Sequence, residues 1–97
     1  MATIVASEVG DGQFEVDVEV DGERHAYQVR VPEALAGRLG AEPAAVARAT
    51  LAFLLDREPP GAILASFDCS VVPGYFPEYE DALPGYLTGP GSPGRSG

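Results

Sequence analysis

The sequence predicts one small α+β domain, in which a three-stranded antiparallel meander packs one face against a long helix and short C-terminal helices. Residues Phe14 to Asp21 alternate apolar and acidic side chains, as in a strand with one buried face. Residues 42–58 carry apolar side chains at helical spacing. The 97 residues allow only one domain, which we assign to residues 1–83, followed by a disordered Pro/Gly-rich tail over 84–97.

The three predicted strands cover residues 3–9, 13–20 and 24–31. Gly10-Asp11-Gly12 and Asp21-Gly22 separate them, and these residues tolerate the positive φ angles of tight turns. In the second and third strands the apolar residues recur at every second position. A slip of one residue would move them to the wrong face, so the register must preserve their parity.

Two hairpin registers satisfy this parity. If Asp21-Gly22 is a two-residue turn, Val18 faces His25. If the loop extends from Asp21 to Arg24, Val20 faces His25 instead. Both registers keep the apolar face intact, so the sequence leaves both open.

Two helices follow the strands. The first is short, from Pro32 to Leu39, with Gly40 as its C-terminal cap. The second opens at Glu42-Pro43 and runs to about Glu58, where Pro59-Pro60 ends it. Its expected buried stripe consists of Val46, Thr50, Phe53 and Leu54, widened by Leu51 and Leu55.

The remaining chain predicts short helical pieces. Residues 61–67 suggest a further helical turn or two, and Asp68 is a suitable N-cap for the next piece. Pro73 and Gly74 limit the length of that piece. Pro77 can start a last helix, which we expect Pro84 to stop.

Charge and composition exclude several classes of function. The net charge is −9 and the chain has no Lys, so phosphate backbones and anionic membrane surfaces repel it. We therefore expect no nucleic-acid or membrane partner. The sequence lacks an apolar run of the ~18 residues that a membrane span needs, and the single Cys69 indicates no disulfide framework. We expect a cytoplasmic protein.

The residue types that support catalysis or metal binding do not form a recognisable motif. His25 has neither a second His nor a Cys pair beside it in the sequence. Cys69 is interpreted as a small core residue, because no Cys–His arrangement can be assembled around it. The acids Glu78, Glu80 and Asp81 are interpreted as an exposed helix start. We predict no catalytic residue, no metal ligand and no cofactor.

Two groups of residues are candidates for binding a partner. The first is an acidic stripe on one face of the second strand. The second is an aromatic cluster, with Tyr75 and Phe76 between Pro73 and Pro77 and Tyr79 two residues after Pro77. Charge complementarity would direct a basic partner to the stripe, although the stripe also fits a solvated outer face. For the aromatic cluster we favour burial, with part of it left exposed as an anchor. The candidate residues are Glu15, Asp17, Glu19, Tyr75, Phe76 and Tyr79.

Two stretches carry a resemblance. Phe53 to Pro59 ends in an acid-Arg-Glu-Pro turn, and Phe67 to Glu80 has the form "FD-SV---YFPEYE". Together with the hairpin, they resemble a group of short uncharacterised bacterial proteins that have a β-hairpin, a long helix and this C-terminal segment. The resemblance implies a shared fold and gives no activity or catalytic residue. The chain departs from the pattern at Cys69 and at Pro73-Gly74.

These observations favour a small acidic, non-enzymatic accessory protein that binds another protein, and they leave the biological process unknown. One alternative is an antitoxin-like or regulatory homodimer that neutralises a basic partner. Another is a metal- or thiol-dependent enzyme that uses His25, Cys69 or the acids near Glu78.

Overall fold

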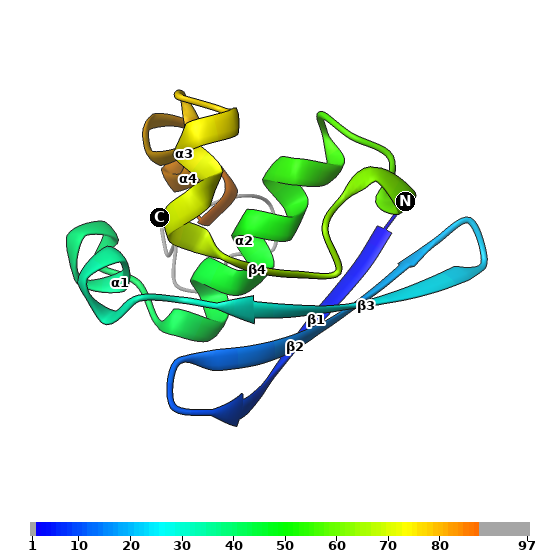
Figure 1. Ribbon diagram of the computed structural model, residues 1–97, viewed down its shortest axis with the longest axis horizontal. Helices are drawn as coiled ribbons and strands as arrows, with labels where there is room; N and C mark the ends of the chain where they lie inside the picture. Colours follow the sequence, from blue (N-terminus) through cyan, green and yellow to red (C-terminus); the bar gives the residue numbers. More distant parts are fainter. Residues whose placement is uncertain (1, 88–97) are drawn as a thin grey trace, which may run out of the picture.

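The computed structural model describes residues 2–87 and has an α+β architecture. A mixed sheet has the strand order β1-β2-β3-β4, and the helices lie against one of its faces (Figure 1). The strands are β1 (Ala2–Gly10), β2 (Gln13–Val20), β3 (Glu23–Arg30) and β4 (Ser66–Asp68). The helices are α1 (Glu33–Leu39), α2 (Pro43–Leu55), α3 (Val72–Tyr75) and α4 (Tyr79–Leu87), with 3-10 turns at Pro60–Ala62 and Cys69–Val71.

The β2–β3 hairpin has the register expected for a two-residue turn. Val18 lies opposite His25, and Val20 opposite Glu23. Asp21 and Gly22 both have positive φ angles, 54° and 82°. Such a turn matches the right-handed twist of the flanking strands. The structure therefore selects one of the two registers that the sequence left open.

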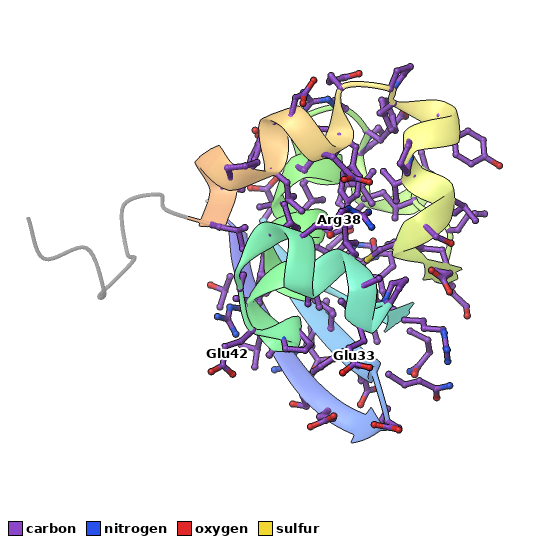
Figure 2. All side chains as sticks on the ribbon, turned by 90° about the vertical axis from the view of Figure 1, so that its left-hand side faces the viewer. Glu33, Arg38 and Glu42 are labelled. Atoms are coloured by element: carbon purple, nitrogen blue, oxygen red, sulfur yellow. The ribbon has the colours of Figure 1, made fainter. Side chains whose placement is uncertain are left out.

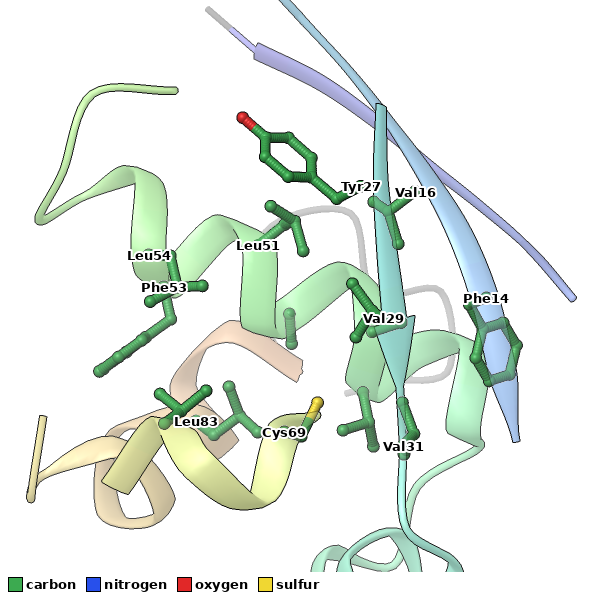
Figure 3. Close-up of a cluster of buried hydrophobic side chains, with 14 of the residues drawn as sticks. Phe14, Val16, Tyr27, Val29, Val31, Leu51, Phe53, Leu54, Cys69 and Leu83 are labelled. Carbon is green, nitrogen blue, oxygen red and sulfur yellow. The ribbon is translucent and has the colours of Figure 1, made fainter. Parts of the chain in front are cut away.

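The core lies between the sheet and α2. The apolar side chains of β2 are buried, with Val16 and Val18 fully so. From α2, Leu51 and Phe53 are also fully buried, as the predicted stripe requires. Figure 3 shows Val16 and Leu51 facing one another between strand and helix. Phe53 lies on the side of α2 that faces the C-terminal segment, where it packs against Phe76 and Tyr79. Alternation in the strand and helical spacing in α2 thus direct two apolar surfaces to the same layer.

The helices after the hairpin agree with the sequence in type, with small shifts at their ends. Gly40 caps α1 in the left-handed conformation, with φ of 64°. Helix α2 ends at Leu55, before the predicted end at about Glu58, and the next residues form a turn. Asp68 accepts a hydrogen bond from the Ser70 amide at 2.8 Å, which confirms its role as an N-cap.

The predicted three-stranded sheet is incomplete, because a fourth strand replaces the expected helical turn near Phe67. Strand β4 pairs in parallel with Gln28 to Arg30 of β3. The Gln28 amide donates to the Ala65 carbonyl at 2.7 Å, and Arg30 lies 3.3 Å from the Asp68 carboxylate. Three residues are too few to show an alternating pattern, so this strand depends on the edge that β3 offers.

The last helix also departs from the prediction, since α4 continues through Pro84 to Leu87. A proline inside a helix removes one backbone hydrogen bond and crowds the preceding turn. Here Leu83 is fully buried beside it, and the Tyr86 hydroxyl donates a hydrogen bond to the carboxylate of Asp56, the residue just after α2. The proposed domain boundary at residue 83 therefore falls inside a helix. The rest of the predicted tail, residues 88–97, lies outside the described residues.

Candidate protein-binding surfaces

The acidic stripe lies on the face of the sheet opposite the helices. Val16 and Val18 of β2 point into the core, so Glu15, Asp17 and Glu19 project from the other face. Asp17 and Glu19 are exposed and Glu15 is half-buried. The stripe is therefore solvated and available to a partner.

The predicted aromatic cluster is divided between surface and core. Tyr75 is 71% exposed, whereas Phe76 is half-buried and packs edge-on against Phe53, with ring centroids 5.7 Å apart. Tyr79 is fully buried and cannot contribute to an exposed surface, so its inclusion among the partner-binding residues was wrong. Burial of this side chain follows from its position on α4, whose inner face packs on α2.

Tyr79 ends in a buried polar cluster. Its hydroxyl lies 2.7 Å from the Thr50 hydroxyl, and Thr50 Oγ1 lies 3.6 Å from Cys69 Sγ. All three residues are fully buried. Burial raises the pKa of the Cys69 thiol and of the Tyr79 hydroxyl. The cluster is thus a set of neutral hydrogen-bonding groups that joins α2 to the C-terminal segment.

The structure does not bring His25 and Cys69 together. Cys69 directly follows β4, which pairs with the Arg30 end of β3, whereas His25 lies near the opposite end of that strand. Five strand residues span about 16 Å. His25 instead lies 3.7 Å from Glu23. Over residues 2–87, no three His, Cys, Asp or Glu side chains gather in a way that could hold a metal ion.

The acids near Pro77 form ion pairs that the sequence did not reveal. Glu78 accepts a hydrogen bond from Arg57 at 3.0 Å, and Glu80 lies 2.9 Å from Arg38. Figure 2 shows Arg38 on α1, on the side where the C-terminal helices lie. Arg57 also lies over the Phe53 ring, 3.7 Å from its centroid. These contacts attach the residues around the start of α4 to α1 and to the turn after α2.

Two hydrogen bonds lower the pKa of the Glu78 carboxyl group. The larger contribution comes from its own backbone amide, and the smaller from the Arg57 side chain. Both favour the charged form of the carboxylate. Glu78 is therefore favoured in its charged form, as the partner of Arg57.

An apolar groove of about 290 Å³ opens beside α3. Leu64, Val71 and Tyr75 on its walls are all exposed, at 58%, 44% and 71%. Of the residues that line the groove, the sequence predicted only Tyr75 and Phe76 as binding residues. The available signal was the apolar pair Ile63-Leu64, which lies shortly after the helix-ending prolines and was predicted only as part of a helical turn. The lining residues are Leu54, Glu58, Ala62, Ile63, Leu64, Phe67, Val71, Val72, Tyr75 and Phe76.

No protein-family model, curated protein or solved structure matches this chain. The functional argument therefore starts from the geometry of the two surfaces. In the part of the chain from residue 2 to 87, none of the helices has the length and apolar character needed to cross a membrane.

Proposed function

We propose that this chain is a small, non-enzymatic accessory protein that binds another protein, and that the apolar groove beside α3 is its binding site. The observation that carries the proposal is the exposure of Leu64, Val71 and Tyr75 around one concave apolar site. Isolated exposed apolar residues are ordinary, but a contiguous group in a groove is typical of interaction sites.

The size and openness of the groove favour a segment of a protein over a small molecule. Its volume is slightly below the range of about 300–1,000 Å³ for ligand pockets. The exposed rim residues Leu64 and Tyr75 would remain partly uncovered around a small ligand. A partner segment can place a few apolar side chains in the groove and cover the rim with its neighbours.

Charge complementarity determines the rest of the partner's chemistry. Among the described residues that line the groove, Glu58 is the only charged one. The chain as a whole carries a net charge of −9. We therefore propose that the occupant is an apolar peptide segment with a Lys or Arg beside its anchors, positioned to meet Glu58.

A peptide library displayed on phage provides the test, with the immobilised full chain as the target. We expect the selected peptides to combine two or three large apolar residues with a neighbouring Lys or Arg. Leu64→Asp places a carboxylate on the exposed rim and should reduce binding of these peptides at least tenfold. Since Leu64 is exposed, this substitution should leave the circular dichroism spectrum unchanged.

Val9→Ser is the matched control, because Val9 is similarly exposed, at 56%, but lies on β1 away from the groove. It should leave peptide binding unchanged. Selection of no peptide family, or of peptides whose binding is indifferent to Leu64→Asp, would contradict the groove as the binding site.

The resemblance to short bacterial proteins and the cytoplasmic location stay predictions. Both are compatible with an accessory protein that binds a partner, but the proposal does not depend on them. It depends on the groove, whose lining residues come from four separate segments of the chain.

A further inference from the structure

Strand β1 forms one edge of the sheet, and within residues 2–87 no strand pairs with its outer side. It is the longest strand, with nine residues, and Glu8 is its only charged residue. Exposed edges of this kind are templates for another strand, and proteins commonly block them with charges, prolines or short length. Here the edge carries little such protection.

The hydrogen-bond pattern shows which backbone groups β1 offers. The Gln28 amide donates to Ala65, on the β4 side of β3. Because bonding directions alternate along a strand, its neighbours Tyr27 and Val29 bond to β2, and the odd-numbered residues of β2 bond to β1. Those residues face Thr3, Val5 and Ser7. The backbone groups of Ile4, Ala6 and Glu8 therefore point outward from the sheet.

We propose that this edge binds an extended, basic segment of a partner protein as a fifth, antiparallel strand. Backbone hydrogen bonds from Ile4, Ala6 and Glu8 would supply affinity, as in other cases of strand addition. Alternate side chains of the added strand would lie on the open face of the sheet, the face that also carries the acidic stripe.

The acidic stripe determines the charge of the occupant. Glu15, Asp17 and Glu19 lie one strand inside the edge, so an added strand would lie about 10 Å away, twice the spacing between strands. The intervening side chains on that face, Thr3, Val5 and Ser7, are short. A Lys or Arg side chain can extend across them towards the carboxylates, whereas an acidic strand would be repelled.

The same charge argument favours a basic strand over a second copy of this chain. Two copies joined through β1 would bring together two proteins that each carry a net charge of −9. Their acidic stripes would lie about three strand spacings apart, or roughly 14 Å. This arrangement offers backbone pairing without charge complementarity.

The test uses a nine-residue peptide of alternating Lys and Val, labelled for fluorescence anisotropy, and a twin in which Glu replaces Lys. We expect saturable binding of the Lys peptide and none of the Glu peptide. The double substitution Glu15→Gln and Glu19→Gln should weaken binding about two- to thirtyfold, the range expected for two exposed ion pairs. On peptide binding, the amides of Ile4, Ala6 and Glu8 should gain protection from hydrogen exchange.

Ala6→Pro separates strand addition from simple charge attraction. It removes an outward-pointing amide and no hydrogen bond to β2, which is the strand position where proline is tolerated. It should abolish binding. Should this variant unfold, a Lys/Val peptide N-methylated at alternate amides tests the same bonds on an unchanged protein and should not bind.

Three results would overturn the inference. The first is binding that survives both Ala6→Pro and N-methylation, since it would need no strand pairing. The second is equal binding of the Glu peptide. The third is a dimer of the free chain that Ala6→Pro dissociates, which would make a second copy the occupant. Leu64→Asp should not affect the Lys peptide, so this edge and the groove can fail independently.

Discussion

The β2–β3 hairpin and the C-terminal segment, residues 66–87, are held by different kinds of contact. The hairpin buries alternate apolar side chains, such as Val16 and Val18, and its polar side chains lie outside the core. The C-terminal segment combines apolar burial with specific polar contacts to α2 and the turn after it, including Tyr79 with Thr50 and Glu78 with Arg57. Burial depends mainly on area, whereas hydrogen bonds require defined geometry.

This difference matters for function because the C-terminal segment builds one wall of the groove. Val71, Val72, Tyr75 and Phe76 lie in or beside α3 and line it. The contacts that fix α4 therefore also fix the position of this wall. We expect the hairpin to determine whether the chain folds, and the polar contacts to determine whether the groove keeps its shape.

The largest expected effect is that of Val18→Asp in the hairpin. Val18 is fully buried, and a carboxylate there would lack a charged partner among the core residues. We expect a loss of about 4–5 kcal/mol or more in the free energy of unfolding. For a domain of this size, that loss should abolish the cooperative thermal transition measured by circular dichroism.

Asp17→Asn is the matched control for this prediction. Asp17 is the neighbour of Val18 on the exposed face, and its substitution should change the free energy of unfolding by no more than about 0.5 kcal/mol. A sharp melt retained by Val18→Asp would show that this face of β2 is not the core.

The same contrast explains what could be predicted from the sequence. The hairpin follows from a local alternation over residues 13–20, and α2 from the spacing of its apolar residues, because each signal reports one buried face. Strand β4 has only three residues and depends on the edge of β3. Helix α4 passes Pro84 because distant residues bury Leu83 and bind Tyr86. No local sequence pattern therefore predicts strand β4 or the continuation of α4 past Pro84.

The candidate sites divide in the same way. The acidic stripe was predicted because Glu15, Asp17 and Glu19 share the period of the strand that carries them. The groove was missed because α2, the 62–64 loop, β4 and α3 contribute to it together. Tyr79 was misplaced because its burial depends on a Thr50 partner 29 residues away.

Tyr79→Phe should have the next largest effect, and it tests the polar contacts of the C-terminal segment. The substitution keeps the ring but deprives the buried Thr50 hydroxyl of its partner at 2.7 Å. We expect the free energy of unfolding to fall by about 1–3 kcal/mol, measured by urea denaturation. Thr50→Val in the same background should then cost less than it does alone, because the hydrogen bond is already absent. Additive effects would show that the two hydroxyls do not interact.

Arg57→Ala should loosen the C-terminal segment more than the hairpin. It removes the hydrogen bond to Glu78, the contact with the Tyr86 hydroxyl and the packing over the Phe53 ring. Hydrogen exchange should accelerate in α4 while the amides of β2 change less, because local opening need not involve the whole domain. Arg48→Ala is the control, since Arg48 is an exposed arginine on α2, the helix that ends just before Arg57. Equal acceleration of exchange in α4 and β2 would show that Arg57 stabilises the whole domain and not mainly the C-terminal segment.

The smallest effect concerns the pH dependence that Glu78 contributes. Hydrogen bonds from its own backbone amide and from Arg57 lower the pKa of this carboxyl group in the folded protein. At a pH between the lowered pKa of the folded protein and the ordinary pKa of Glu, the unfolded chain binds more protons at this position than the folded chain does. The contribution of Glu78 to stability therefore rises with pH in this range. It is complete above about 4.3, the ordinary pKa of Glu, and is lost as the pH falls through the folded value.

Glu78→Gln should therefore flatten the stability profile measured by urea denaturation in this acidic range, while the profile at neutral pH keeps its slope. In the Arg57→Ala background the same substitution should have a smaller effect, but not a zero one, because the backbone amide of residue 78 remains. An unchanged acidic slope in Glu78→Gln would show that this carboxylate does not help to hold α4. The charged contacts of the C-terminal segment would then resemble the solvated stripe on β2 more than the buried Tyr79–Thr50 pair.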